Sequence, residues 1–153
     1  MLQWFFVGIV LLAAPGAVWA ADLSKQDKAL VLAVANSVSK ATEARHIDGV
    51  MAVMSQDVQF VQMIPGRKPI MADYSSYRQY IGKLFPLAKK IEYSRSQEIF
   101  EYGASQDELI FTFKMRLGVA VTHKPMEEAT STQTWHLRRT PAGLKVFKLL
   151  ISP

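Results

Sequence analysis

The sequence predicts an α+β domain in which N-terminal helices pack in a strongly curved antiparallel sheet. Two observations lead to this fold class. Apolar residues recur at helical spacing early in the chain, whereas strands separated by short turns fill its second half. Consecutive strands with short turns pair in antiparallel fashion, and helices gathered at one end of the chain cover one face of the resulting sheet.

Residues 1–20 are typical of a secretory signal peptide. An apolar stretch runs over residues 4–14, and small residues stand at Ala17 and Ala20. Because such residues suit a signal peptidase, we expect cleavage after Ala20 and a single mature domain over 21–153. The apolar stretch is shorter than the roughly 20 residues of a transmembrane helix. We therefore expect a periplasmic or secreted protein without stable membrane insertion; the alternatives are a buried N-terminal helix and a retained anchor.

The composition excludes several kinds of site. The chain has no cysteine, which excludes disulfides, thiolate metal sites, thiol catalysis and a lipid on an N-terminal cysteine. The formal net charge is +5, but the basic residues are spread along the sequence. Nucleic-acid binding needs basic residues clustered on one face with aromatic platforms, so we predict no nucleic-acid partner. The three histidines lack metal-ligand spacing, so we predict no metal site and no cofactor.

Three helices are predicted before and between the first strands. The first begins after Ser24, whose hydroxyl can accept a backbone N–H bond, and ends near residue 44. A shorter helix spans 46–54. The third spans 74–84 and is ended or kinked by Pro86. The first two present apolar residues on one face, as a helix that covers a sheet must, and the third carries Tyr74, Tyr77 and Tyr80 at helical spacing.

Strands are predicted over residues 57–64, 91–102, 108–122, 129–139 and 144–151. The segment 108–122 is the clearest, because seven apolar residues alternate along it: Leu109, Phe111, Phe113, Met115, Leu117, Val119 and Val121. At ~3.3 Å per residue this strand would span roughly 50 Å. A strand of that length must bend, and Gly118 is the predicted place of a bulge or kink.

Two segments resemble the nuclear transport factor 2-like superfamily, whose members include SnoaL-like and ketosteroid isomerase-related domains with a cystatin-like fold. Residues 43–60 contain the acidic-glycine step Asp48-Gly49, an apolar helix and the strand entry Asp57-Val58. Residues 135–146 resemble the closing hairpin of the family, with Leu144 in place of the usual aromatic residue. The resemblance implies a cone-shaped sheet with an apolar cavity at its open end. It also implies a homodimer formed through the sheet face.

The resemblance implies that the isomerase site is missing. Ketosteroid isomerases need a carboxylate base late in the first strand and a protonated acid on the penultimate strand, beside a tyrosine on the first helix. Aligned on Asp48-Gly49 and Asp57, these positions fall at or beside Gln62, within 134–136 and near Val38. A glutamine cannot abstract a proton, and loss of a positioned base forfeits ~10²–10⁴-fold in rate.

His136 is the candidate for a different enzymatic role. A dehydratase-like site pairs a strand histidine with a carboxylate, so one alternative is a lyase or cyclase that uses His136 together with Gln62. The competing interpretation is a hydrogen-bonded strand histidine. The sequence does not decide which side of this strand faces the cone. Either Thr132, Thr134 and His136 face it, or Trp135 and Leu137 do, because a slip of one residue moves every side chain to the other face.

The leading hypothesis is a domain that binds a small apolar or amphipathic molecule in its cone without catalysis. The alternative to both the binder and the enzyme is an interaction module of an envelope assembly, with the sheet face docking a partner protein. The apolar stripe of 108–122 is expected to be core and, toward the open end, cavity wall. The predicted ligand-binding residues are Phe60, Gln62, Tyr77, Phe111, Phe113, Met115, Thr134 and Trp135.

Overall fold

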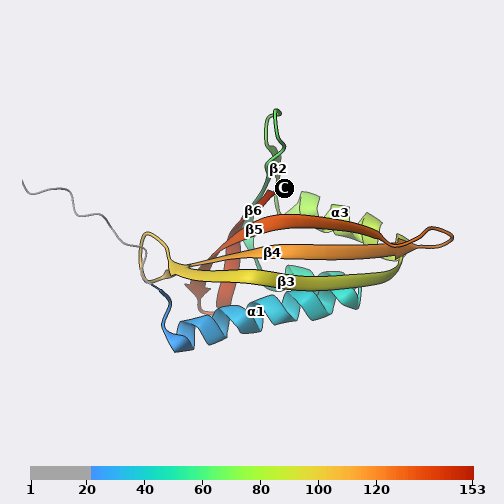
Figure 1. Ribbon diagram of the computed structural model, residues 1–153. Coiled ribbons are helices and arrows are strands. Elements are labelled where there is room, and N and C mark those ends of the chain that lie inside the picture. Colours follow the sequence, from blue (N-terminus) through green and yellow to red (C-terminus); the bar gives the residue numbers. More distant parts are fainter. Residues whose placement is uncertain (1–21) are drawn as a thin grey trace, which may run out of the picture.

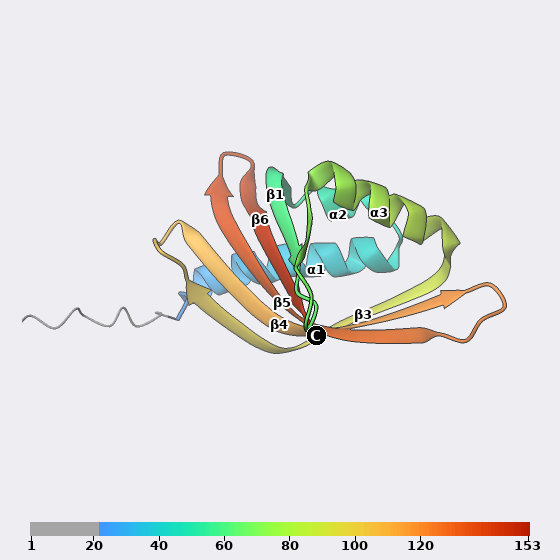
Figure 2. The ribbon, with the colours of Figure 1, turned by 90° about the horizontal axis from the view of Figure 1, so that it is seen from above.

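The computed structural model describes residues 22–153, so the predicted signal peptide and its cleavage site lie outside the described residues. Figure 1 labels the helices and strands, and Figure 2 shows the helices lying within the concave side of a bent, unclosed sheet. The α+β fold class is thereby confirmed. No helix among residues 22–153 is long and apolar enough to cross a membrane. The helices are α1 (Lys25–Glu43), α2 (Ile47–Met51) and α3 (Tyr74–Leu87), and the strands are β1 (Met54–Gln62), β2 (Ile70–Ala72), β3 (Ala88–Tyr102), β4 (Glu108–Val121), β5 (Glu127–Thr140) and β6 (Gly143–Ser152).

The six strands lie in the order β2-β1-β6-β5-β4-β3. The strands β3 to β6 form an antiparallel meander, as predicted. The expectation of a wholly antiparallel sheet is wrong at one place, since β1 and β6 pair in parallel. The chain leaves β1, crosses through β2 and α3 to the opposite edge of the sheet, and returns strand by strand. The meander therefore places β6 beside β1. Turn signals in the sequence act between neighbouring strands and do not specify this pairing.

Helix α1 forms where its sequence predicts it. The Ser24 hydroxyl accepts a hydrogen bond from the Asp27 backbone N–H at 3.1 Å, which caps the first turn. The inward-facing residues are small, and the residues buried along the helix are Val31, Ala35, Val38 and Ala41. Small side chains on this face leave room for the large side chains of the sheet, so the core is filled mainly from the strands.

Two details of the chain between α2 and β3 differ from the sequence-based expectation. Helix α3 includes Pro86 in its last turn and ends at Leu87, three residues later than predicted. The backbone N–H of Ala88 caps it by donating to the carbonyls of Leu84 and Phe85. Strand β2 has three residues, which pair with the end of β1 in a hairpin. A strand that short carries no measurable alternation, which explains why the sequence did not predict it.

The predicted bulge at Gly118 is wrong. The glycine lies opposite Glu92 and Glu128 in continuous register, so β4 runs through it without interruption. The pairing of β3 with β4 has two register shifts, one between Ala88 and Lys90 and one between Ser96 and Ile99, where β3 has an extra residue and Gln97 adopts a positive φ of 53°. The extra residue therefore bends β3 rather than β4. Gly118 instead accommodates Met126, whose sulfur would lie 2.8 Å from a β-carbon at this position.

The core is densest at one end of the cone, which we call the closed end and define by Phe100, Leu109, Phe111 and Phe113. The last three of these residues have no exposed surface. The rings of Phe111 and Phe113 stack with their centroids 4.6 Å apart, and Trp135 packs edge-on against both. The odd-numbered set of β5 thus faces the helices, which settles the orientation that the sequence left open.

Candidate functional site

A cavity of about 370 Å³ lies at the other end of the cone. We call this the open end and define it by Tyr93, Met115 and Leu117 of the sheet together with the inner face of α3. Small-molecule sites have volumes of ~300–1,000 Å³, so the cavity is large enough to hold a small ligand. Its walls come from all three helices and from all six strands. Most of the lining side chains are apolar, with Trp135 and Leu149 among those contributed by the central strands.

The cavity collects five of the eight predicted ligand-binding residues. These are Phe60, Gln62, Tyr77, Met115 and Trp135. Phe60 and Tyr77 stack with their ring centroids 3.9 Å apart, which joins β1 to α3. Gln62 is exposed and lies at the rim of the cavity, where β1 ends.

The other three predicted residues lie outside the cavity. Phe111 and Phe113 are core residues of the closed end, although they share the inner face of β4 with Met115. Thr134 lies on the outer face of the sheet, where its hydroxyl is 3.1 Å from that of Thr112. The pleat places alternate residues of β5 on opposite faces, so Trp135 and Thr134 could not both line one cavity.

His136 does not reach the cavity either. It belongs to the same outer face as Thr134, and its Nδ1 lies 2.7 Å from Oε1 of Glu108. Its ring centroid is 6.0 Å from that of Phe147. A lyase or cyclase site that combines His136 with Gln62 is therefore contradicted, because the sheet separates the two side chains. His136 is a hydrogen-bonded strand histidine.

Tyr93 of β3 is the site residue that the sequence did not single out. Its side chain lines the cavity, and its hydroxyl oxygen is buried without any hydrogen-bond partner in the described part of the chain. Burial raises the pKa of the Tyr93 phenol, and burial likewise raises the pKa of Tyr77 to about 12. Both phenols therefore stay protonated near neutral pH and keep a proton to donate. Polar residues between Ile91 and Tyr102 obscure the alternation that would have pointed Tyr93 inward.

Gln133 is the other buried polar residue of the cavity wall, with 7% of its surface exposed. Its amide oxygen accepts a hydrogen bond from the Trp135 indole at 2.9 Å. Its amide nitrogen lies 3.0 Å from the sulfur of Met115. Gln133 thus holds the indole in place with its oxygen, while the Tyr93 hydroxyl remains without a partner.

Among the described residues that line the cavity, none is Asp, Glu, His, Lys or Arg. Asp48 and Asp57, on which the isomerase positions were aligned, form ion pairs at the outer surface. Asp48 pairs with Arg78 at 2.6 Å, and Asp57 pairs with Arg138 at 2.5 Å. The Arg138 guanidinium, with the Ser55 hydroxyl, lowers the pKa of Asp57 to about 2. Within residues 22–153, no group of three or more His, Asp and Glu side chains could hold a metal ion. The cavity offers neutral phenol, amide and hydroxyl groups, the last from Thr42 and Ser76, in a mostly apolar wall.

No family model matches the chain, and no curated protein matches it either. Solved structures match over most of its length. A protein of Novosphingobium aromaticivorans described as a candidate aromatic ring hydroxylase has a TM-score of 0.74 and 14% identity, covering 85% of this chain and 90% of that one. A candidate scytalone dehydratase of the same organism has a TM-score of 0.72 and 10% identity, covering 82% and 83%.

A third match carries a family name. It is a candidate dehydratase of the nuclear transport factor 2-like family from Streptomyces avermitilis, with a TM-score of 0.68 and 14% identity, covering 86% of this chain and 98% of that one. Identities this low show the arrangement of the chain and not its chemistry. The helix order, the bent sheet and these likenesses together show that residues 22–153 adopt the nuclear transport factor 2-like fold.

Proposed function

We propose that this protein is an exported ligand-binding domain that holds a small apolar or amphipathic molecule in its cone without transforming it. The observation that carries the proposal is the unpaired Tyr93 hydroxyl in a cavity lined mostly by apolar side chains. A buried hydroxyl without a partner costs ~1–3 kcal/mol. A ligand with one polar atom at the level of Tyr93 recovers that cost when it binds.

The shape of the ligand follows from the cavity wall. An apolar body would contact the stacked Phe60 and Tyr77 rings and the side chain of Leu117. Burial of apolar surface contributes ~25 cal/mol per Å², so this contact would supply most of the affinity. The Tyr93 phenol would orient the molecule by a single hydrogen bond. We therefore expect a neutral ligand, since a buried charge would meet no countercharge in the lining.

Binding without catalysis is favoured by the chemistry of the lining. General acid–base catalysis needs a group whose pKa lies near the working pH. The ionisable groups of this cavity are tyrosines, and burial raises the pKa of Tyr77 and Tyr93 further from neutrality. The hydroxylase and dehydratase names belong to proteins that share the fold at 10–14% identity. We assign no reaction to this chain.

Export and a homodimer through the outer sheet face complete the proposal. Export rests on the apolar stretch and small residues of positions 1–20. The dimer is supported by the half-buried aromatic ring of Phe147 and the threonine pair Thr112 and Thr134 on the convex face. Size-exclusion chromatography with light scattering would show twice the mass of the mature chain if this face pairs two copies.

Native mass spectrometry of the protein purified from a periplasmic extract tests the proposal. We expect a mass that begins at Ala21 and a second species that carries a small molecule. The variant Leu117→Trp, which places an indole in the cavity, should lose that species while keeping its fold. An empty protein that also binds nothing from a panel of lipids, sterols and aromatic compounds would refute ligand binding. Co-purification of a second polypeptide would favour the envelope-assembly alternative.

A further inference from the structure

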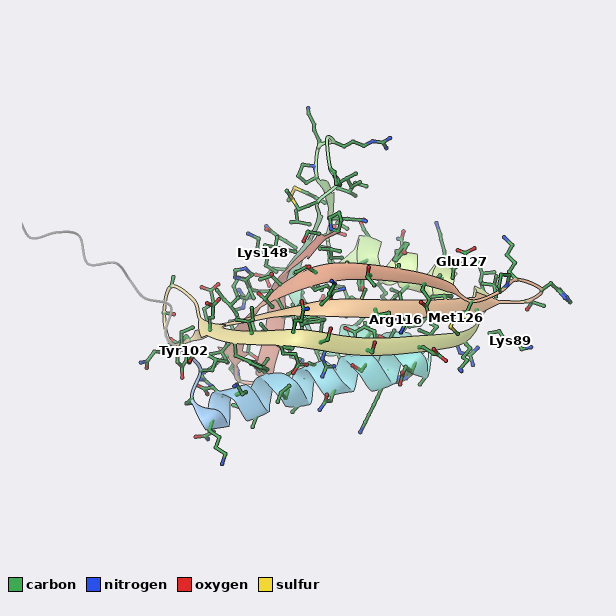
Figure 3. The ribbon with its side chains drawn as sticks, viewed as in Figure 1. Lys89, Tyr102, Arg116, Met126, Glu127 and Lys148 are labelled. Carbon is green, nitrogen blue, oxygen red and sulfur yellow. The ribbon has the colours of Figure 1, made fainter. Side chains whose placement is uncertain are left out.

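The hairpin that joins β1 to β2 projects from the body of the protein. Figure 1 shows it rising away from the sheet, and Figure 3 shows its side chains standing clear of the neighbouring elements. Three of its apolar side chains are exposed: Met63 by 47%, Ile70 by 54% and Met71 by 66%. Single exposed apolar residues are common on protein surfaces, but three on one nine-residue hairpin indicate a surface that is covered by something else.

The tip of the hairpin is basic. Arg67 and Lys68 follow Gly66, whose positive φ of 69° makes the turn, and both side chains are exposed. Neither side chain takes part in an ion pair in the described part of the chain. The sequence has no acidic residue between Asp57 and Asp73. The hairpin therefore presents two uncompensated positive charges at its tip. Below the tip it presents the exposed side chains of Met63, Ile70 and Met71, which we call the apolar shoulders.

The hairpin is also the rim of the cavity. Gln62, Ile70 and Ala72, which stand at the ends of β1 and β2, line the cavity directly. Ile70 is both exposed and part of the lining, so the apolar surface of the hairpin continues into the cavity. A partner that covers the hairpin would face the cavity mouth.

We propose that this hairpin docks on an anionic phospholipid membrane, so that the cavity opens toward the bilayer and exchanges its ligand with it. Lys and Arg side chains are attracted to anionic headgroups, and the apolar shoulders enter the interfacial layer. A membrane fits better than a folded protein partner, because a stable protein interface buries ~1,200–2,000 Å² and a single projecting hairpin offers far less. The exchange of ligand rests on the proposed function, whereas the docking itself stands apart from it.

Vesicle sedimentation with the mature protein tests the docking. The vesicles contain phosphatidylcholine alone or phosphatidylcholine with 30% phosphatidylglycerol, at low ionic strength. We expect binding to the anionic vesicles only. The double variant Arg67→Ala/Lys68→Ala should bind about 30-fold more weakly, since each basic residue near an anionic membrane contributes about fivefold. The control Lys89→Ala/Lys124→Ala removes the same charge from exposed lysines outside the hairpin and should bind like the wild type; Figure 3 shows Lys89 well away from the hairpin.

A second variant tests the apolar shoulders. Met63→Ser/Met71→Ser keeps the charge and changes no cavity-lining residue, so it should weaken vesicle binding severalfold and make the remainder more sensitive to salt. Absence of wild-type binding to the anionic vesicles, or equal losses in the hairpin and control variants, would overturn the docking proposal.

The cavity is measured separately, by the fluorescence of N-phenyl-1-naphthylamine in vesicle-free buffer. Both hairpin variants should bind this probe like the wild type, whereas Leu117→Trp should not bind it. A protein that binds vesicles but not the probe would refute the proposed function and leave the docking intact, so the two failures are distinguishable. A hairpin variant that loses the probe as well as the vesicles would count against a separate docking surface.

Discussion

The two ends of the cone use the same strand in opposite ways. At the closed end, β4 places Phe111 and Phe113 in a ring cluster without exposed surface, and Phe100 stacks on Phe111 with a centroid distance of 4.8 Å. At the open end, Met115 and Leu117 continue the same alternation but line a cavity of about 370 Å³. The difference shows that alternation predicts which side chains face inward and not whether the interior is filled.

The two ends of the cone also differ in the hydrogen bonding of their tyrosine hydroxyls. Strand β3 carries Tyr102 at the closed end, whose hydroxyl donates to Asp27 at 2.6 Å and accepts from the Ser24 backbone N–H at 3.3 Å. Tyr93 on the same strand reaches the open end, and its buried hydroxyl has no partner within residues 22–153. The closed end is thus satisfied both in packing and in hydrogen bonding, as a structural core should be. At the open end, the Tyr93 hydroxyl has no partner and the side chains leave a cavity between them.

Truncation of a ring should reveal the largest contrast between the ends. Phe111→Ala should lower the free energy of unfolding by ~3–5 kcal/mol, because a fully buried ring leaves a cavity behind. Met115→Ala should cost less than ~2 kcal/mol, because one side of Met115 already faces empty space. Urea denaturation followed by circular dichroism measures both values. Equal losses would mean that the open end is as well packed as the closed end.

The next largest difference in stability between the two ends should appear when a side chain is enlarged to tryptophan. Leu109→Trp should destabilise the protein by about 3 kcal/mol, because a filled core must distort to accept the indole. Leu117→Trp should change the stability by less than ~1 kcal/mol, because its indole occupies the cavity. Thermal unfolding of the two variants checks this, and a destabilised Leu117→Trp protein would argue against an empty open end.

Removal of the two hydroxyls should shift stability in opposite directions. Tyr102→Phe should lose ~1–2 kcal/mol, because Asp27 and the Ser24 N–H both lose a partner. Tyr93→Phe should stabilise the ligand-free protein by ~1 kcal/mol, because a buried unpaired hydroxyl is removed. The same variant should weaken any ligand with a polar atom at that level. Titration calorimetry with the co-purified ligand would measure this loss, and unchanged affinity would rule out Tyr93 as the polar contact.

The smallest effect concerns the outer surface beside the closed end. Arg138 and Ser55 lower the pKa of Asp57 to about 2, against an ordinary value of 3.8. The stabilisation is therefore fully present above the ordinary pKa of 3.8 and is lost as the pH falls through about 2. Since both side chains are exposed, it amounts to less than ~1 kcal/mol. Asp57→Asn should be slightly less stable than the wild type at pH 7, and the difference should shrink on acidification and vanish below pH 2 in denaturation experiments.

The fold was predictable from sequence where the signal was local. The alternation from Leu109 to Val121 and the helix predicted after Ser24 each correspond to an observed element with nearly the predicted bounds. The inward face of that helix was not predicted correctly, since its apolar spacing began at Leu30, which is 42% exposed, whereas Val31 and Ala35 are buried. The candidate site was predictable in part. The expected cone led to five residues that line the cavity, namely Phe60, Gln62, Tyr77, Met115 and Trp135. Phe111, Phe113 and Thr134 were assigned to the cavity in error. Tyr93 was missed because its strand shows no clean period.

What the sequence by itself determined is the type of each long element and, for β4, the face that it buries, because these depend on residues two to four positions apart. Only the tertiary structure decided the parallel pairing of β1 with β6, the inward facing of Trp135 and the division of β4 into core and cavity wall. Each of these depends on groups far apart in the chain, such as the distance that α3 keeps from the sheet. The cavity exists because side chains of α3 and of the sheet do not come into contact at the open end. A pattern of neighbouring residues in the sequence carries no information about that distance.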